Sequence, residues 1–124
     1  MDVPRISKEE LKERLDAAGP SAPLIVDVRL KYPFEHSTVT LPGALRMSPS
    51  GLDREKLSRD REIVLYDSDP EELVSTHVAE ELLRQGYKVR VLAGGIGEWV
   101  TAKLPTASKP APQPAAPAAG SLKG

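Results

Sequence analysis

Three short apolar runs constrain the fold of this chain more than any other feature of its sequence. They lie at residues 24–28, 63–66 and 89–92, and each consists mostly of Leu, Ile and Val. Apolar runs of this length are typical of strands that are covered on both faces. Segments with a helical pattern separate the runs, as in parallel sheets flanked by helices. The sequence therefore predicts an α/β three-layer sandwich with a small, mainly parallel central sheet.

The segments between these strands carry their own signals. Ser7 and Glu10 have the spacing of a capping box, which predicts a helix over residues 8–18. Apolar residues recur at helical spacing after the second strand, so a long helix is expected over residues 70–85. Shorter elements are expected as a strand at residues 44–47, a helix at residues 52–57, and a last helix that carries Ile96, Trp99 and Val100.

The composition changes near residue 105. Five of the 12 prolines lie in residues 105–124, a stretch with no aromatic residue and one large aliphatic residue, Leu122. Such a segment buries too little apolar area to offset the entropy lost on ordering it. We therefore assign residues 1–105 to one domain and residues 106–124 to a flexible, Pro/Ala-rich tail.

The charge and the residue counts exclude several classes of function. The chain has 17 basic and 18 acidic residues and a formal net charge of −1, so we expect no nucleic-acid partner. No apolar run is long enough to span a membrane, and the N-terminus lacks the pattern of a signal peptide. With no cysteine and two histidines, thiolate and histidine-rich metal sites are excluded. We expect a cytoplasmic protein without cofactor, metal or membrane partner.

An acidic turn follows the strand expected at residues 63–66. It consists of Asp67, Ser68, Asp69, Pro70, Glu71 and Glu72. Ligands of parallel α/β sheets bind at the carboxyl ends of the strands, so this turn is the candidate functional loop. A turn from a strand into a helix normally attracts anions, because backbone N–H groups and the helix dipole point to one place. Here that place carries carboxylates instead.

Most of the turn has a structural explanation as a helix cap. Asp69 fits the N-cap position, Pro70 the first helical position, and Glu72 the third, where it completes a capping box. Glu71 complements the positive end of the helix. Asp67 is not needed by this cap, so two interpretations stay open for it: a leftover polar residue, or a residue that faces a ligand or partner.

Several short motifs follow one another along the chain. They are Ile6-Ser7-x-x-Glu10-Leu11, Leu24-Ile25-Val26-Asp27-Val28-Arg29, Leu41-Pro42-Gly43-Ala44, Ile63-Val64-Leu65-Tyr66, and Gly94-Gly95-Ile96-x-x-Trp99 with Leu104-Pro105 after it. In this order, over residues 5–105, they resemble a rhodanese-like domain, the fold of thiosulfate sulfurtransferases. The resemblance implies that Asp27 and Arg29 buttress the strand ends near the loop. We also expect Arg46 to reach toward the acidic loop and to offset its charge.

The loop departs from this family at the residue that carries the chemistry. Family members begin the loop with a cysteine, and this chain has Asp67 there. The turn is most similar to a subgroup whose loop reads Y-C-x-C-P-x-E, so Asp69 stands at the second cysteine. The family transfers sulfur through a cysteine persulfide, which a carboxylate cannot form. A carboxylate also repels an anionic donor, by about 4 kcal/mol for unit charges about 4 Å apart at an effective dielectric of about 20.

The sequence therefore predicts a rhodanese-like domain that is a non-catalytic binding or regulatory module rather than an active sulfurtransferase. Its expected partner is a protein that binds through the acidic loop at residues 67–72, and such a loop favours a cationic segment or ion. Two alternatives stay open. In one, Asp67 is the nucleophile or general base of an enzyme with a divalent metal, similar to the Asp-x-Asp of haloacid-dehalogenase-type phosphotransferases. In the other, the domain keeps a sulfurtransferase-type role and an external thiol supplies the sulfur chemistry.

Overall fold

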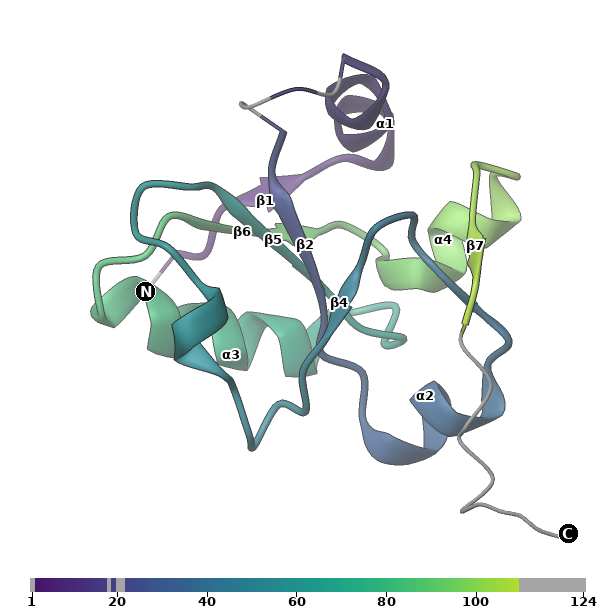
Figure 1. Cartoon of the computed structure of the whole chain (residues 1–124). Helices are drawn as coiled ribbons and strands as arrows, with labels where there is room; N and C mark the ends of the chain where they lie inside the picture. Colours follow the sequence, from purple (N-terminus) through teal and green to yellow (C-terminus); the bar gives the residue numbers. More distant parts are fainter. Residues whose placement is uncertain (1, 18, 20–21, 110–124) are drawn as a thin grey trace, which may run out of the picture.

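Five parallel strands form the central sheet of the structure, a computed structural model that describes residues 2–17, 19 and 22–109 (Figure 1). The strand order is β1-β6-β5-β2-β4. The strands are β1 (Arg5–Ile6), β2 (Leu24–Asp27), β4 (Leu45–Arg46), β5 (Ile63–Tyr66) and β6 (Val89–Leu92). The predicted α/β architecture with a small parallel sheet is confirmed.

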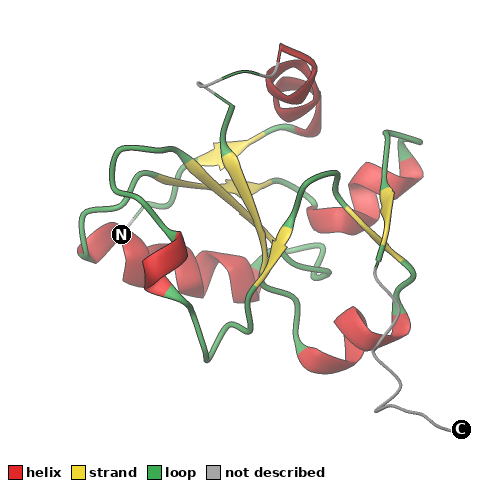
Figure 2. Ribbon diagram, in the orientation of Figure 1, coloured by secondary structure: helices red, strands yellow, loops and turns green. Residues whose placement is uncertain are grey.

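Helices cover both faces of this sheet and complete three layers (Figure 2). Helices α1 (Lys8–Ala17) and α4 (Gly95–Thr101) pack on one face, and α3 (Leu73–Arg84) packs on the other. Successive strand residues point to opposite faces and therefore enter two separate cores. The core under α1 and α4 includes Leu11, Ile25, Val64, Leu92 and Trp99. The core under α3 includes Val26, Leu65, Val78, Leu82 and Val91.

The remaining elements lie around the sheet. They are α2 (Lys31–His36), the 3₁₀ turn η1 (Arg54–Lys56), and an antiparallel ribbon of β3 (Val39–Thr40) and β7 (Ala107–Ser108). Residues 106–109, which the sequence assigned to the tail, thus add a strand to the domain, and the N–H of Lys109 donates to the oxygen of Thr38 (2.9 Å). The rest of the expected tail, residues 110–124, lies outside the described residues. No helix in the described part of the chain has the length and apolar character needed to cross a membrane.

Helix α1 starts at the predicted residue, whereas helix α2 was not expected. Ser7 caps α1 as predicted, because its Oγ accepts the N–H of Glu10 (3.0 Å). The carboxylate of Glu10 binds Arg90 instead of returning to the cap. Helix α2 was not predicted, since Pro33 lies within it. Proline has no backbone N–H. This is tolerated at Pro33 because N–H groups in the first turn of a helix have no acceptor within the helix.

The turn between β6 and α4 packs directly on the candidate loop. Gly94 and Gly95 adopt left-handed φ angles of 80° and 64°, which favour glycine. A Cβ atom at Gly95 would lie 2.6 Å from the main-chain oxygen of Asp67. That oxygen accepts the N–H of Ile96 (2.9 Å). The glycine pair therefore allows the turn to approach the loop closely and to hydrogen-bond to it.

We expect Gly95→Ala to lower the free energy of unfolding by about 2 kcal/mol or more, because the new methyl group meets a backbone oxygen and the left-handed φ becomes strained. Gly97→Ala is the matched control in the same helix, since nothing lies within 4 Å of its Cβ position. It is expected to raise stability by about 0.5–1 kcal/mol. Urea unfolding of both variants measures the difference, and equal stabilities would contradict the close approach.

Candidate functional site

The loop between β5 and α3 is held together by the carboxylate of Asp67. This residue is buried, with 1% of its surface exposed. Its Oδ1 accepts the N–H of Asp69 (2.8 Å), and its Oδ2 accepts the N–H of Ser75 (2.6 Å). Ser75 lies in the first turn of α3, where helical N–H groups lack a helical acceptor. Both oxygens of Asp67 are therefore engaged with backbone of the same loop and helix.

The sequence predicted the wrong residues for the N-terminal cap of helix α3. Helix α3 begins at Leu73, three residues later than expected, and its N-cap is Glu72, which has a φ of 59° and no side-chain capping bond. Asp69 instead closes a small turn, in which its Oδ1 accepts the N–H of Glu71 (2.9 Å). Asp67, which the sequence analysis left outside the cap, is the side chain that reaches the first turn of the helix.

Glu72 fixes the other end of the loop. Its side chain is buried, its Oε1 pairs with the guanidinium of Arg5, and its Oε2 accepts the N–H of Gly94 (2.9 Å). The loop is thereby joined to β1 and to the glycine turn. Of the carboxylates in the loop, those of Asp67 and Glu72 point inward.

The outer surface of the loop is formed by the other polar residues. Ser68 and Glu71 are exposed, and Asp69 is partly exposed. Among the described residues, neither Asp69 nor Glu71 takes part in an ion pair. The acidic character of the loop that solvent meets therefore comes from these two side chains alone, half of the carboxylates that the sequence places there.

Burial raises the pKa of Asp67 above the usual value of 3.8. The hydrogen bonds from the N–H groups of Ser75 and Asp69 act in the opposite direction, and the nearby carboxylate of Asp69 adds to the rise. The folded chain thus holds a proton on Asp67 at pH values where the unfolded chain has released it.

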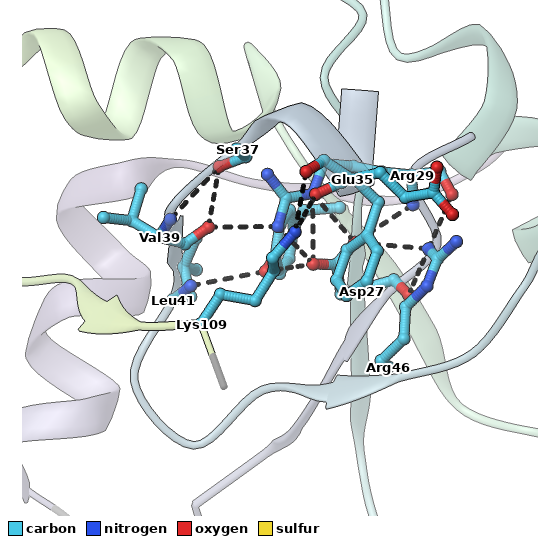
Figure 3. A network of polar contacts seen from close by, with 10 residues as sticks. Asp27, Arg29, Glu35, Ser37, Val39, Leu41, Arg46 and Lys109 are labelled. Carbon is cyan, nitrogen blue, oxygen red and sulfur yellow. Dashed lines mark hydrogen bonds and ion pairs between the residues drawn. The ribbon is translucent and has the colours of Figure 1, made fainter. Parts of the chain in front are cut away.

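A buried ionic network supports the strand ends beside the loop (Figure 3). Asp27 and Arg29 are both 1% exposed, and the Nη2 of Arg29 donates to the Oδ2 of Asp27 (2.6 Å). The hydroxyl of Tyr66 donates to the same oxygen (2.8 Å) and accepts the N–H of Leu41 (3.3 Å). Burial, together with the charge of Asp27, raises the pKa of Tyr66 far above its usual value, so it remains a protonated donor. The structure thus joins Asp27 and Arg29 to each other and to Tyr66, and their role as buttresses of the loop stays a prediction.

The expectation for Arg46 is wrong. Its Nη1 donates to the main-chain oxygens of Arg29 (2.6 Å) and Asp27 (3.3 Å), and its guanidinium stacks 4.1 Å from the ring centre of Phe34. Lys109 approaches the same ring to 4.4 Å. Burial lowers the pKa of Arg46. Arg46 therefore belongs to the network around Asp27 and does not neutralise the acidic loop.

The described residues offer no ready metal site. No group of three or more His, Asp or Glu side chains among them is placed to hold a metal ion. His77 is exposed on α3, and His36 contacts the main-chain oxygen of Tyr32 (3.0 Å) at the end of α2. Neither histidine joins the carboxylates of the loop.

The sequence of this chain matches one protein family over most of its length. A family model described as the rhodanese-like domain matches residues 7–102. The chain belongs to the rhodanese-like family. No curated protein matches it in sequence. Within this rhodanese-like domain, the chain lacks the cysteine of sulfurtransferases, since it contains no cysteine at all.

Solved structures share the fold at low sequence identity. A full-length protein from Lactobacillus plantarum aligns with a TM-score of 0.76 and 22% identity over 85% of this chain and 88% of that one. A rhodanese-related protein from Thermoplasma volcanium aligns with a TM-score of 0.67 and 24% identity over 84% and 97%. The thiosulfate sulfurtransferase from Pseudomonas aeruginosa aligns with a TM-score of 0.67 and 23% identity over 86% of this chain and 19% of that one. At these identities the likeness shows the fold alone.

Sequence reasoning missed the residues that complete the loop. Ser75 contributes a backbone N–H, and Arg5 contributes an ion pair to Glu72 across 67 positions of the chain. A backbone N–H is present in almost every residue type, so Ser75 could not be recognised from its side chain. An ion pair between residues far apart in the chain has no characteristic spacing in the sequence. The glycine pair at 94–95 was the one available signal, because a left-handed turn after a strand marks a close approach.

Arg29→Met is expected to lower the free energy of unfolding by about 3 kcal/mol or more, because it leaves a buried carboxylate without its main cation. Arg54→Met is the matched control: the Arg54–Glu81 pair (3.3 Å) is largely exposed, and its loss is expected to cost less than about 1 kcal/mol. Chemical denaturation compares the two variants. Similar losses would contradict a structural role for the buried pair.

The raised pKa of Asp67 predicts a pH dependence with a definite sign. The stability contributed by its protonation is fully present below pH 3.8 and is lost as pH rises through the raised pKa. Wild type is therefore expected to lose stability relative to Asp67→Asn as pH rises from about 4 to about 7. Urea unfolding of both proteins across this range measures the difference.

A second variant separates titration from hydrogen bonding. Asp67→Ser also lacks a carboxyl group that titrates, and its hydroxyl forms different hydrogen bonds from the amide of Asn, so wild type compared with it should show the same pH profile. The measured quantity is the free energy of unfolding of wild type minus that of each variant. If it stays constant or increases as pH rises, the pKa of Asp67 is not raised.

Proposed function

We propose that this chain is a non-catalytic rhodanese-like domain that acts as a binding or regulatory module for a protein partner. One observation carries the proposal. Asp67 stands where the family resemblance places the sulfur-carrying cysteine, and both of its carboxylate oxygens accept backbone N–H groups in a buried position. The residue at the nucleophile position therefore stabilises the loop.

The chemistry of sulfur transfer supports the same conclusion. A persulfide requires a thiolate that accepts a sulfane sulfur and releases it again. The chain has no cysteine, so no residue of its own carries this intermediate. The N–H groups of Asp69 and Ser75, which would otherwise be free to bind an anion, already have an acceptor. A thiosulfate ion would meet a carboxylate in their place.

The alternative in which Asp67 is a catalytic nucleophile or base has weaker support. A nucleophile needs an oxygen that reaches substrate, and a metal-assisted reaction needs further oxygen ligands nearby. Asp67 has 1% exposure, and no group of three acidic or histidine side chains in the described residues is placed around a metal. We therefore do not propose an enzymatic role.

A partner would meet the outward carboxylates of the loop. Asp69 and Glu71 are at least partly exposed, while Asp67 and Glu72 are buried. Two exposed carboxylates near the amino end of a helix favour a partner with Lys or Arg side chains. The acidic loop at residues 67–72 is thus proposed as part of the recognition surface, through these two residues.

We expect no sulfurtransferase turnover above background when the wild-type chain is assayed with thiosulfate and cyanide, because no thiolate is available to carry the sulfur. The double variant Asp67→Cys, Asp69→Cys is expected to gain a measurable rate, because the loop then loses the two carboxylate hydrogen bonds that hold it closed, and the N–H groups of residues 69 and 75 face an accessible thiolate. Initial rates of thiocyanate formation report both results.

Ser58→Cys is the matched control, because it adds an exposed thiol outside the loop. It should stay at background. A clear wild-type rate that disappears in Asp67→Ala would falsify the proposed function. Gain of activity by Ser58→Cys would show that any surface thiol suffices and that the loop contributes nothing.

A further inference from the structure

A groove of about 700 Å³ lies next to the loop, between α3, the start of α2 and the segment after β4. Val74 and Val78 of α3 line it, together with Leu30, Pro49 and Leu73. Asp67 is not among the lining residues. The lining segments follow the carboxyl ends of β2, β4 and β5, which is the edge where parallel sheets bind their ligands. Its volume falls in the range of ligand-binding clefts, about 300–1,000 Å³.

Two aliphatic side chains of the groove are left open to solvent. Leu30 is 52% exposed and Leu73 is 65% exposed. They come from different elements, the end of the segment after β2 and the first residue of α3. Exposed apolar side chains that gather around a hollow mark an interaction site more often than single exposed residues do. The groove therefore has an apolar lining that nothing within the described residues covers.

The charges around the groove are unequal. Glu71 precedes Leu73 by two residues, so their Cα atoms are at most about 7 Å apart. Glu71 and Asp69 do not line the groove but precede it in the loop, and neither has an ion-pair partner among the described residues. Glu81, which lines the groove farther along α3, already pairs with Arg54. Lys31 lines the groove from the start of α2. A cation in the groove is thus favoured near Glu71 and disfavoured near Lys31.

We propose that this groove docks a short peptide segment of a partner protein in which an aliphatic residue is followed closely by Lys or Arg. The aliphatic side chain packs between Leu30 and Leu73, over Val74 and Val78. The basic group pairs with Glu71 and Asp69. The inference rests on the proposed function as a binding module and gives the chemistry of the partner.

The probe is a display library of random short peptides, selected on the full wild-type chain. The expected result is enrichment of peptides with an aliphatic residue followed by Lys or Arg. Leu73→Asp should weaken the binding of an enriched peptide about tenfold or more, because it places a charge where the aliphatic side chain packs. Glu71→Lys should weaken it about fivefold at low salt, and this effect should shrink at high salt. Fluorescence anisotropy of a labelled peptide measures each dissociation constant.

Matched controls separate the groove from general surface properties. Val100→Asp changes an exposed aliphatic residue of α4 (46% exposed), and Glu55→Lys changes an exposed carboxylate of η1. Both should leave the dissociation constant within about twofold of wild type. Leu73→Asp is compatible with folding, since an acidic residue is favoured in the first turn of a helix. Circular dichroism and thermal unfolding check that every variant is folded.

The outcomes distinguish this docking site from the proposed function. The docking site is wrong if no peptide is enriched, if enriched peptides lack the basic residue, or if Leu73→Asp weakens binding no more than Val100→Asp. It is also wrong if Glu71→Lys has no effect. If the enriched peptides bind all groove variants equally, the docking site is wrong, and the domain binds its partner through a different surface. A wild-type sulfurtransferase rate, in contrast, would overturn the proposed function itself.

Discussion

The carboxylate of Asp67 accepts the N–H groups of Asp69 and Ser75, and the shape of the candidate loop depends on these two hydrogen bonds. A buried backbone N–H without an acceptor costs about 1–3 kcal/mol, so both donors need a partner once the loop is closed. In many turns from a strand into a helix, a bound anion is that partner. In this chain a side chain supplies the negative charge, and the loop is complete without a ligand.

Other contacts hold the loop in the same closed arrangement. Gly95 allows the following turn to come within hydrogen-bonding distance of the main-chain oxygen of Asp67, and Glu72 joins the loop to Gly94 and Arg5. Turning Asp67 outward would therefore leave two backbone N–H groups without an acceptor inside a segment that is fixed at both ends. These contacts support the proposal that the carboxylate of Asp67 is a structural group of the loop.

The sequence predicted the parts of the fold that depend on local patterns. The strand at residues 63–66 has the predicted bounds, because an apolar run ends there at a charged residue. The two-residue strands β1, β3 and β7 were missed, since so short a run leaves no periodicity. The start of α3 was misplaced because Asp67 reaches Ser75 across eight positions, whereas the capping rule considers only three. The contacts of Arg46 were likewise decided by tertiary packing.

The buried ionic network lies between the candidate loop and the proposed docking groove. Leu30 follows Arg29 directly, and Arg29 is held by Asp27, so the network fixes the point at which one wall of the groove begins. Ser48, two residues after Arg46, begins another wall. A binding site needs open space and groups without internal partners. The interior of the loop has neither, whereas the groove offers the space and the outward carboxylate of Glu71 offers the charge. Residues expected to support a catalytic loop therefore also support the surface on which we place recognition.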